Sequence, residues 1–205
     1  MRLRTACMAA LLCLACLPSA RAEELIELTV WGDMKNQALL YRSEGGRAAV
    51  LVHQSGATME SWRDFAKRLE SRGMTALSLA NSTPSDVAAA VGFLQDEGHD
   101  DIVLIGASIG GGAVLQAVKA NGWPSVRRIV LLANSSGPGP QSSEIAKLFL
   151  VAKQDFYAAG TYSAYEKTAE PKRLVEFEGR EHGQALLEGE HAEQALDVVL
   201  SFIGP

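Results

Sequence analysis

A serine between two glycines is the residue best placed to do chemistry in this sequence. Residues 106–110 read Gly-Ala-Ser-Ile-Gly, at the end of the apolar segment DIVLIGA. A G-x-S-x-G pentapeptide between a strand and a helix is typical of a nucleophile elbow, a tight turn that exposes the serine hydroxyl. Small residues at Gly106 and Gly110 allow strand and helix to approach closely. The pattern predicts Ser108 as a nucleophile; a structural serine at a crowded helix start is the alternative.

A nucleophilic serine needs a base that takes its proton and an acid that orients the base. On this type of scaffold they follow in the order serine, acid, histidine. His182 lies in the loop sequence GREHG, whereas His191 falls in the first turn of the final predicted helix, so we predict His182 as the base. Asp155 follows the apolar segment KLFLVAKQ and is the predicted acid, with a plain helix cap as its alternative. Asp197 comes after both histidines and is out of order.

Acyl transfer also needs two backbone N–H groups that hold the oxyanion. Ile109 directly follows the serine at the predicted helix start and supplies one of them. The other should come from the loop after the segment AAVLVH, where Ser55 is the first choice and Gln54 the second. His53 precedes the serine in the chain, and we expect it to brace this loop. The glycine-rich segment around Ser108 lacks the sequence patterns of dinucleotide-binding and nucleotide-binding loops, and no metal-ligand spacing appears in the sequence. We therefore expect neither a cofactor nor a metal.

The elements that position these residues alternate between strands and helices. Continuous apolar runs with β-branched residues are typical of buried strands, and apolar residues at helical spacing are typical of amphipathic helices. The patterns predict strands at 25–31, 37–43, 48–53, 74–80, 101–107, 127–133, 147–152 and 173–177, and helices at 59–72, 83–98, 109–120, 157–169 and 190–202. We therefore predict an α/β fold with a mostly parallel sheet of about eight strands, flanked by helices on both faces.

The N-terminal segment has the pattern of a secretory signal peptide. Two arginines precede an apolar run at 6–17, and the sequence Ala-Arg-Ala at 20–22 offers a cleavage site. We expect residues 1–22 to be removed on export to the periplasm or the medium, and residues 23–205 to form one domain. A buried N-terminal helix is one alternative. Lipid attachment at Cys16 is another, because Leu-Ala-Cys at 14–16 resembles the end of a lipoprotein signal.

Removal of this segment changes both the charge and the thiol content of the chain. It takes away Arg2, Arg4 and Arg21 and no acidic residue, so the formal net charge goes from −5 to −8. An acidic surface argues against nucleic acid or an anionic membrane as a partner. All three cysteines lie in the removed segment, so we expect no disulfide in the mature chain. The sequence leaves the oligomeric state open.

Several of these segments resemble the α/β-hydrolase superfamily. AAVLVHQSG, a following SW, DIVLIGASIGGGAVL, KLFLVAKQD and EHG are similar to small, lidless bacterial members of the dienelactone hydrolase and carboxylesterase type. The resemblance covers about residues 25–203 and implies the same roles for Ser108, Asp155 and His182, with Ser55 and Ile109 as oxyanion donors. The sequence departs from the family in its His-Gln pair, where many members have His-Gly. Dienelactone hydrolases proper use a cysteine nucleophile, so the resemblance implies esterase-like chemistry rather than their substrate.

A short connection limits the size of the site. Only residues 134–146 separate two predicted strands at the place where many such hydrolases insert a helical lid. We therefore expect no cap domain and an open site for a small, soluble ester or thioester. The leading hypothesis is an exported serine hydrolase that works through an acyl-enzyme. The alternatives are a catalytically silent binding module with the same fold, and an acyltransferase that uses the same three residues.

Overall fold

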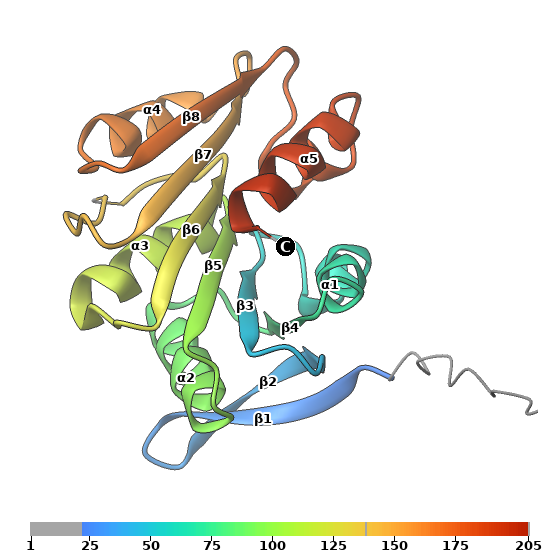
Figure 1. Cartoon of the computed structure of the whole chain (residues 1–205). Coiled ribbons are helices and arrows are strands. Elements are labelled where there is room, and N and C mark those ends of the chain that lie inside the picture. Colours follow the sequence, from blue (N-terminus) through green and yellow to red (C-terminus); the bar gives the residue numbers. More distant parts are fainter. Residues whose placement is uncertain (1–21, 138, 205) are drawn as a thin grey trace, which may run out of the picture.

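The computed structural model describes residues 22–137 and 139–204. The predicted signal peptide, residues 1–22, therefore lies almost entirely outside the described residues. Within them, eight strands form one sheet in the order β1-β2-β4-β3-β5-β6-β7-β8 (Figure 1). The strands are β1 (Glu24–Trp31), β2 (Met34–Tyr41), β3 (Arg47–Val52), β4 (Met74–Leu79), β5 (Asp101–Ala107), β6 (Val126–Leu132), β7 (Ala146–Ala152) and β8 (Lys172–Phe177). The expected number of strands is confirmed.

The sheet is parallel from β4 through β3, β5, β6 and β7 to β8. Of the eight strands described, only β2 runs against this direction, since it pairs antiparallel with β1 on one side and with β4 on the other. In a parallel sheet the carboxyl ends of all strands meet at one edge, where ligands of such folds bind. The predicted mostly parallel sheet is thus confirmed, and the loops after β3, β5, β7 and β8 meet at that edge.

Helices cover both faces of the sheet, as predicted (Figure 1). On one face lie α2 (Pro84–Asp96), α3 (Ile109–Asn121) and α4 (Ala158–Glu166), and on the other lie α1 (Arg63–Glu70) and α5 (Ala192–Ile203). Successive side chains of a strand point to opposite faces. In β3, Val50 packs with the first set of helices and Leu51 with the second, and both are fully buried. This two-sided burial explains why the strands read as continuous apolar runs rather than alternating ones.

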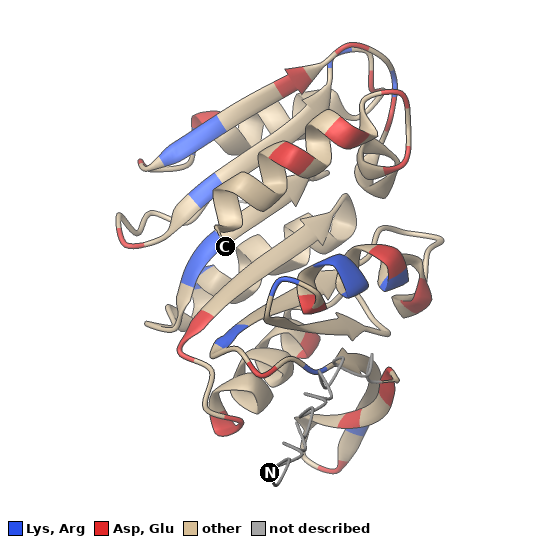
Figure 2. Ribbon diagram, turned by 45° about the vertical axis from the view of Figure 1, so that its right-hand side comes forward, with Lys and Arg blue, Asp and Glu red and all other residues tan. Residues whose placement is uncertain are grey.

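Charged side chains are kept to the ends of the inner strands. Figure 2 shows lysine, arginine, aspartate and glutamate on the helices, the loops, the β1–β2 hairpin and the strand ends, while the middle of the inner strands is free of them. The buried exception is Lys147, whose ammonium donates hydrogen bonds to the carbonyl oxygens of Ser142 at 2.5 Å and Ala169 at 3.0 Å. Burial lowers the pKa of Lys147 from its ordinary value. The charge is tolerated because backbone oxygens replace its hydration.

Two short 3₁₀ segments differ from the predicted elements. The helix expected over 59–72 divides into η1 (Met59–Trp62) and α1, because the chain turns to bury Trp62 against the sheet. A second 3₁₀ segment, η2 (Gly183–Leu187), follows His182 where the sequence indicated only a loop. Its five residues are too few for helical periodicity to be recognised. Residues after Leu132 and before Ala146 form no helix in the described part of the chain, so the expected absence of a cap domain is confirmed.

Among residues 22–137 and 139–204, none of the helices is both long and apolar enough to cross a bilayer.

Candidate active site

Ser108 occupies a strained turn directly after β5. Its backbone angles are φ 50° and ψ −115°, and a positive φ is uncommon for a residue with a side chain. Such a conformation costs on the order of 1–3 kcal/mol and persists only where the surroundings impose it. Here the N–H of Ser108 donates to Leu132 O at 2.9 Å, and its carbonyl accepts from Ser135 N at 3.2 Å. Both bonds come from the chain that leaves the neighbouring strand β6, so the sheet itself holds the turn.

Glycines around the serine allow α3 to start against the sheet. A Cβ atom at Gly106 would lie 2.6 Å from Gly110 O, and one at Gly110 would lie 2.4 Å from Val52 O. A Cβ atom at Gly111 would lie 2.6 Å from the Cβ of Asn134. Real Cβ atoms do not approach this closely, so each position excludes a side chain unless the backbone moves. The glycines therefore determine how near the start of α3 lies to the ends of β3 and β5.

The glycine at position 110 provides a test of this packing. Gly110→Ala should destabilise the fold by about 2 kcal/mol or more, because the added methyl group meets two backbone carbonyls that cannot easily move. Gly92, in the middle of α2, has no atom within 4 Å of the position of an added Cβ. Gly92→Ala should therefore stabilise by about 0.5–1 kcal/mol through helix propensity. Urea unfolding of both variants measures the contrast, and equal stability of the two would contradict it.

The structure brings Ser108, His182 and Asp155 into one hydrogen-bonded chain. His182 Nε2 lies 2.8 Å from Ser108 Oγ, and His182 Nδ1 lies 2.7 Å from Asp155 Oδ2. Asp155 follows β7, and its other oxygen, Oδ1, accepts from the N–H of Tyr157 at 2.9 Å. The side chain of Asp155 is only 2% exposed, whereas that of His182 is 25% exposed. Three residues separated by up to 74 positions thus form a relay that runs from a buried carboxylate through a partly exposed imidazole to the Ser108 hydroxyl.

The two remaining predicted donors, Ile109 and Ser55, belong to the start of α3 and to the loop after β3. Ile109 is the first residue of α3, and the N–H groups of a first helical turn have no partner inside the helix. Ser55 lies in the loop after β3, and that loop adjoins the start of α3 at Gly110. Gln54, the second choice, already donates its N–H to Gln184 Oε1 at 3.3 Å. The N–H of Gln54 is thus engaged by Gln184, and Ser55 makes no such bond to Gln184.

Gln184 is a residue that the sequence reasoning missed. Its N–H donates to Gln54 Oε1 at 2.8 Å, so the two glutamines exchange reciprocal hydrogen bonds. Its side-chain amide also donates to Ser61 Oγ at 2.9 Å, and the residue is only 5% exposed. This glutamine pair joins the loop after β3 to the loop that carries His182. No local pattern signals it, because the two residues are 130 positions apart in the chain.

The other histidines near this edge have different surroundings. His53 is buried, and its ring nitrogens lie 2.8 Å from Gln54 O and 3.1 Å from Ala80 O. It therefore braces the loop after β3, as expected. His191 precedes α5, and its ring stacks on Phe177 at a centroid distance of 5.8 Å. Neither ring makes the contact with Ser108 that His182 makes within the described residues.

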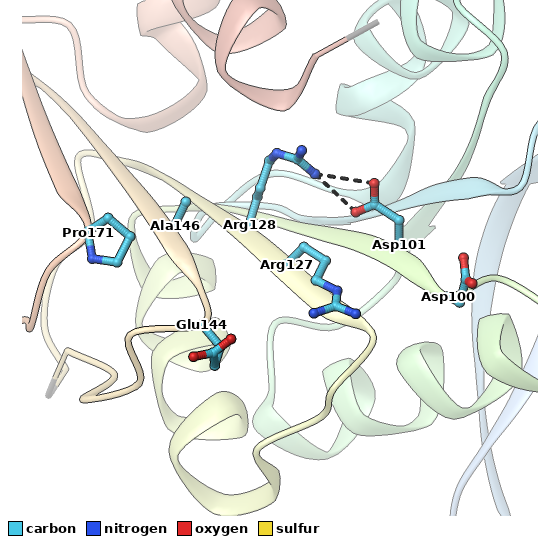
Figure 3. A pocket seen from close by; sticks show the side chains of 7 residues that line it. All are labelled: Asp100, Asp101, Arg127, Arg128, Glu144, Ala146 and Pro171. Atoms are coloured by element: carbon cyan, nitrogen blue, oxygen red, sulfur yellow. Dashed lines mark hydrogen bonds and ion pairs between the residues drawn. The ribbon is translucent and has the colours of Figure 1, made fainter.

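A cavity of about 460 Å³ opens beside the relay. It is lined by six residues: Gln154, Asp155, Phe156, Tyr157, Arg180 and His182. A different cavity, of about 390 Å³, lies at the opposite edge of the sheet, where the strands begin (Figure 3). There Asp101 accepts hydrogen bonds from Arg128 and Arg47 at 3.0 Å. Because His182 lines the cavity at the carboxyl edge, a substrate in that cavity would lie beside the residue that contacts Ser108.

No cluster of metal ligands accompanies the relay in the part of the chain that the structure describes. None of the described residues form a group of three or more histidine, cysteine, aspartate or glutamate side chains that could hold a metal ion.

Comparison with known proteins relates the fold to several hydrolases. No protein-family model and no curated protein matches the sequence. Among solved structures, a dienelactone hydrolase from Anabaena variabilis ATCC 29413 is 19% identical, with a TM-score of 0.72 over 88% of this chain and 96% of its own. An esterase domain from Rhodothermus marinus is 17% identical, with a TM-score of 0.71 over 89% and 100%. An alpha/beta hydrolase from Penicillium sp. sh18 is 13% identical, with a TM-score of 0.75 over 89% and 98%. At these identities the similarity establishes a shared fold.

Proposed function

We propose that this protein, which has the α/β-hydrolase fold, is a serine hydrolase that cleaves carboxylic ester or thioester bonds of small substrates. The observation that carries the proposal is the relay from Ser108 Oγ through His182 to Asp155, with contacts of 2.8 and 2.7 Å. A nucleophile in contact with a base, which an acid in turn orients, is the arrangement needed for covalent acyl transfer. Two of the similar structures, an esterase domain and a dienelactone hydrolase, belong to proteins of this class of reaction.

In the first half of the reaction, the Ser108 hydroxyl attacks the carbonyl carbon of the ester. His182 Nε2 takes the hydroxyl proton as the new C–O bond forms, and Asp155 stabilises the resulting imidazolium through Nδ1. The carbonyl oxygen becomes an oxyanion, which accepts hydrogen bonds from the N–H groups of Ile109 and Ser55. His182 then gives the proton to the leaving group, at the oxygen of a departing alcohol or at the sulfur of a departing thiol. An acyl group remains on Ser108.

In the second half, water replaces the alcohol. His182 Nε2 accepts a proton from the water as its oxygen attacks the acyl carbon, and the same two N–H groups hold the second oxyanion. When the bond to Ser108 Oγ breaks, His182 returns the proton to the serine and the carboxylic acid leaves. The start of α3 assists both steps, because the N-terminus of a helix favours negative charge nearby.

We also propose that the protein acts after export. The described fold holds Glu23, the residue that follows the predicted cleavage site: its carboxylate accepts from Arg63 Nη2 at 2.6 Å and from Tyr41 OH at 3.1 Å. Burial and this bond to Glu23 raise the pKa of Tyr41 to about 12, so its hydroxyl stays a donor at neutral pH. A chain that begins at Glu23 would thus keep its first residue bound to the domain.

One experiment tests both proposals. The full chain is expressed in a bacterial host, and the exported fraction is treated with a fluorophosphonate, which reacts with activated serines. The intact mass should match residues 23–205 plus one adduct, and peptide sequencing should place the adduct on Ser108. Folded protein without an adduct would instead favour a silent binding module. An unprocessed chain, or one that begins with a lipid-bearing Cys16, would contradict cleavage after Ala22.

A further inference from the structure

Exposed apolar side chains gather beside the relay. Among the described residues, six large hydrophobic side chains are exposed, and they fall into two groups. One group lies at the hairpin of β1 and β2, and the other adjoins Ser108 and Asp155 in sequence. The first group is Leu25, Trp31 and Met34, and the second is Ile109, Phe156 and Tyr157. Single exposed apolar residues are normal, but three beside one reactive centre suggest a surface that a substrate covers.

Phe156 and Tyr157 are held in a defined position relative to His182. They form the turn between Asp155 and α4, which is closed by a hydrogen bond from Ala158 N to Asp155 O at 3.1 Å. Their rings meet edge to face with centroids 5.0 Å apart, and the Tyr157 ring lies 5.0 Å from the His182 ring. Phe156 nevertheless remains 90% exposed. The two rings therefore form an aromatic ledge, and none of the residues that the structure describes covers Phe156.

The geometry of ester cleavage decides which part of a substrate reaches this ledge. The carbonyl oxygen must lie toward the N–H of Ile109, and the departing oxygen must lie toward His182 Nε2, which protonates it. The alcohol side of the ester thus lies on the side of His182, where the cavity of about 460 Å³ is lined by Phe156 and Tyr157. The acyl group takes the remaining direction, away from the ledge.

We infer that Phe156 and Tyr157 bind the alcohol part of the substrate, and that this alcohol carries a flat, apolar group, preferably an aromatic ring. The inference rests on the proposed ester hydrolysis at Ser108. An aromatic group on Phe156 gains from ring contacts of the kind that Phe156 and Tyr157 already make with each other. Arg180 lines the same cavity.

The test compares acetate esters that differ only in their alcohol: methyl, benzyl and naphthylmethyl. Phe156→Ala should lower kcat/KM for the naphthylmethyl ester roughly 3- to 10-fold, with a smaller loss for benzyl and the smallest for methyl, because only the larger groups reach the ledge. A second series keeps the benzyl alcohol and lengthens the acyl chain, and here the loss should stay constant. Because Phe156 is 90% exposed, the variant is expected to fold normally.

Trp31→Ala is the matched control, since it removes an aromatic ring that is 80% exposed but lies on the hairpin far along the sheet from β5. It should leave both series unchanged. A loss in Phe156→Ala that is equal for all alcohols, that is absent, or that grows with the acyl chain instead would overturn the inference. If the unaltered protein hydrolyses none of the esters and takes up no fluorophosphonate, the proposed function itself fails, which is a separate outcome.

Discussion

Replacing Ser108 by alanine should lower kcat/KM for a short-acyl nitrophenyl ester by about 10⁴-fold or more. The remaining rate enhancement would be the part that the oxyanion donors and substrate binding supply without a nucleophile. The hydroxyl is the only group of this residue that contacts His182, at 2.8 Å, and alanine cannot form an acyl-enzyme. The backbone is kept, because alanine has the same Cβ atom as serine and meets the same strain at φ 50°. The comparison is made by steady-state kinetics with the urea unfolding curve of each protein.

Ser71→Ala provides the control for the loss of a serine hydroxyl. Ser71 ends α1 and donates to Arg68 O at 2.8 Å, on an exposed surface away from the carboxyl edge of the sheet. This variant should retain full activity. Turnover in Ser108→Ala that equals that of the unaltered protein would remove Ser108 from the mechanism, whatever the unfolding curves show.

Asp155→Asn should lower kcat by about 10⁴-fold, the size of effect seen where a triad histidine is held in the wrong tautomer. The reason lies in the two bonds of this carboxylate. Tyr157 N–H donates to Oδ1, so the carbonyl oxygen of an asparagine would stay at that place, and its NH₂ group would face His182 Nδ1. Nδ1 would then have to accept a hydrogen bond, and Nε2 would carry the proton. A protonated Nε2 cannot take the proton of Ser108.

Asp197→Asn makes the same chemical change at an exposed position of α5, after both histidines. It should leave kcat within the error of the assay. An Asp155→Asn variant with kcat within about tenfold of the unaltered protein would mean that the carboxylate does not set the tautomer, since the tautomer effect is about 10⁴-fold. Fluorophosphonate labelling should slow in parallel with kcat, because it needs the same activated serine.

Local sequence was sufficient for most of the fold. The inner strands could be predicted because they are buried on both faces and therefore read as runs such as DIVLIGA or KLFLVA. The helices α2 and α3 could be predicted from their apolar residues and from the cap at Thr83, whose hydroxyl accepts from Asp86 N at 3.2 Å. The split of 59–72 into η1 and α1 was missed, because the burial of Trp62 depends on contacts with the distant sheet.

Part of the candidate site could be predicted from local sequence and part could not. The turn at Ser108 has a local signal, since glycines at 106 and 110 stand at fixed spacing from it. The hydrogen bond between Gln54 and Gln184 has no local signal, and neither does the contact of the Tyr157 ring with the His182 ring. Both depend on which loops the sheet order brings together, and composition or periodicity does not carry that information.

By itself, then, the sequence determined the type and order of the elements and indicated the candidates for nucleophile, acid and base. It did so because hydrophobic period, glycine spacing and chain order are properties of neighbouring residues. Only the tertiary structure decided that Gln54 N–H is bonded to Gln184, and that Phe156 stays exposed while Trp62 is buried. These outcomes depend on contacts between segments that lie far apart in the chain. Such contacts decide which apolar side chains are buried and which buried polar groups find a hydrogen-bond partner.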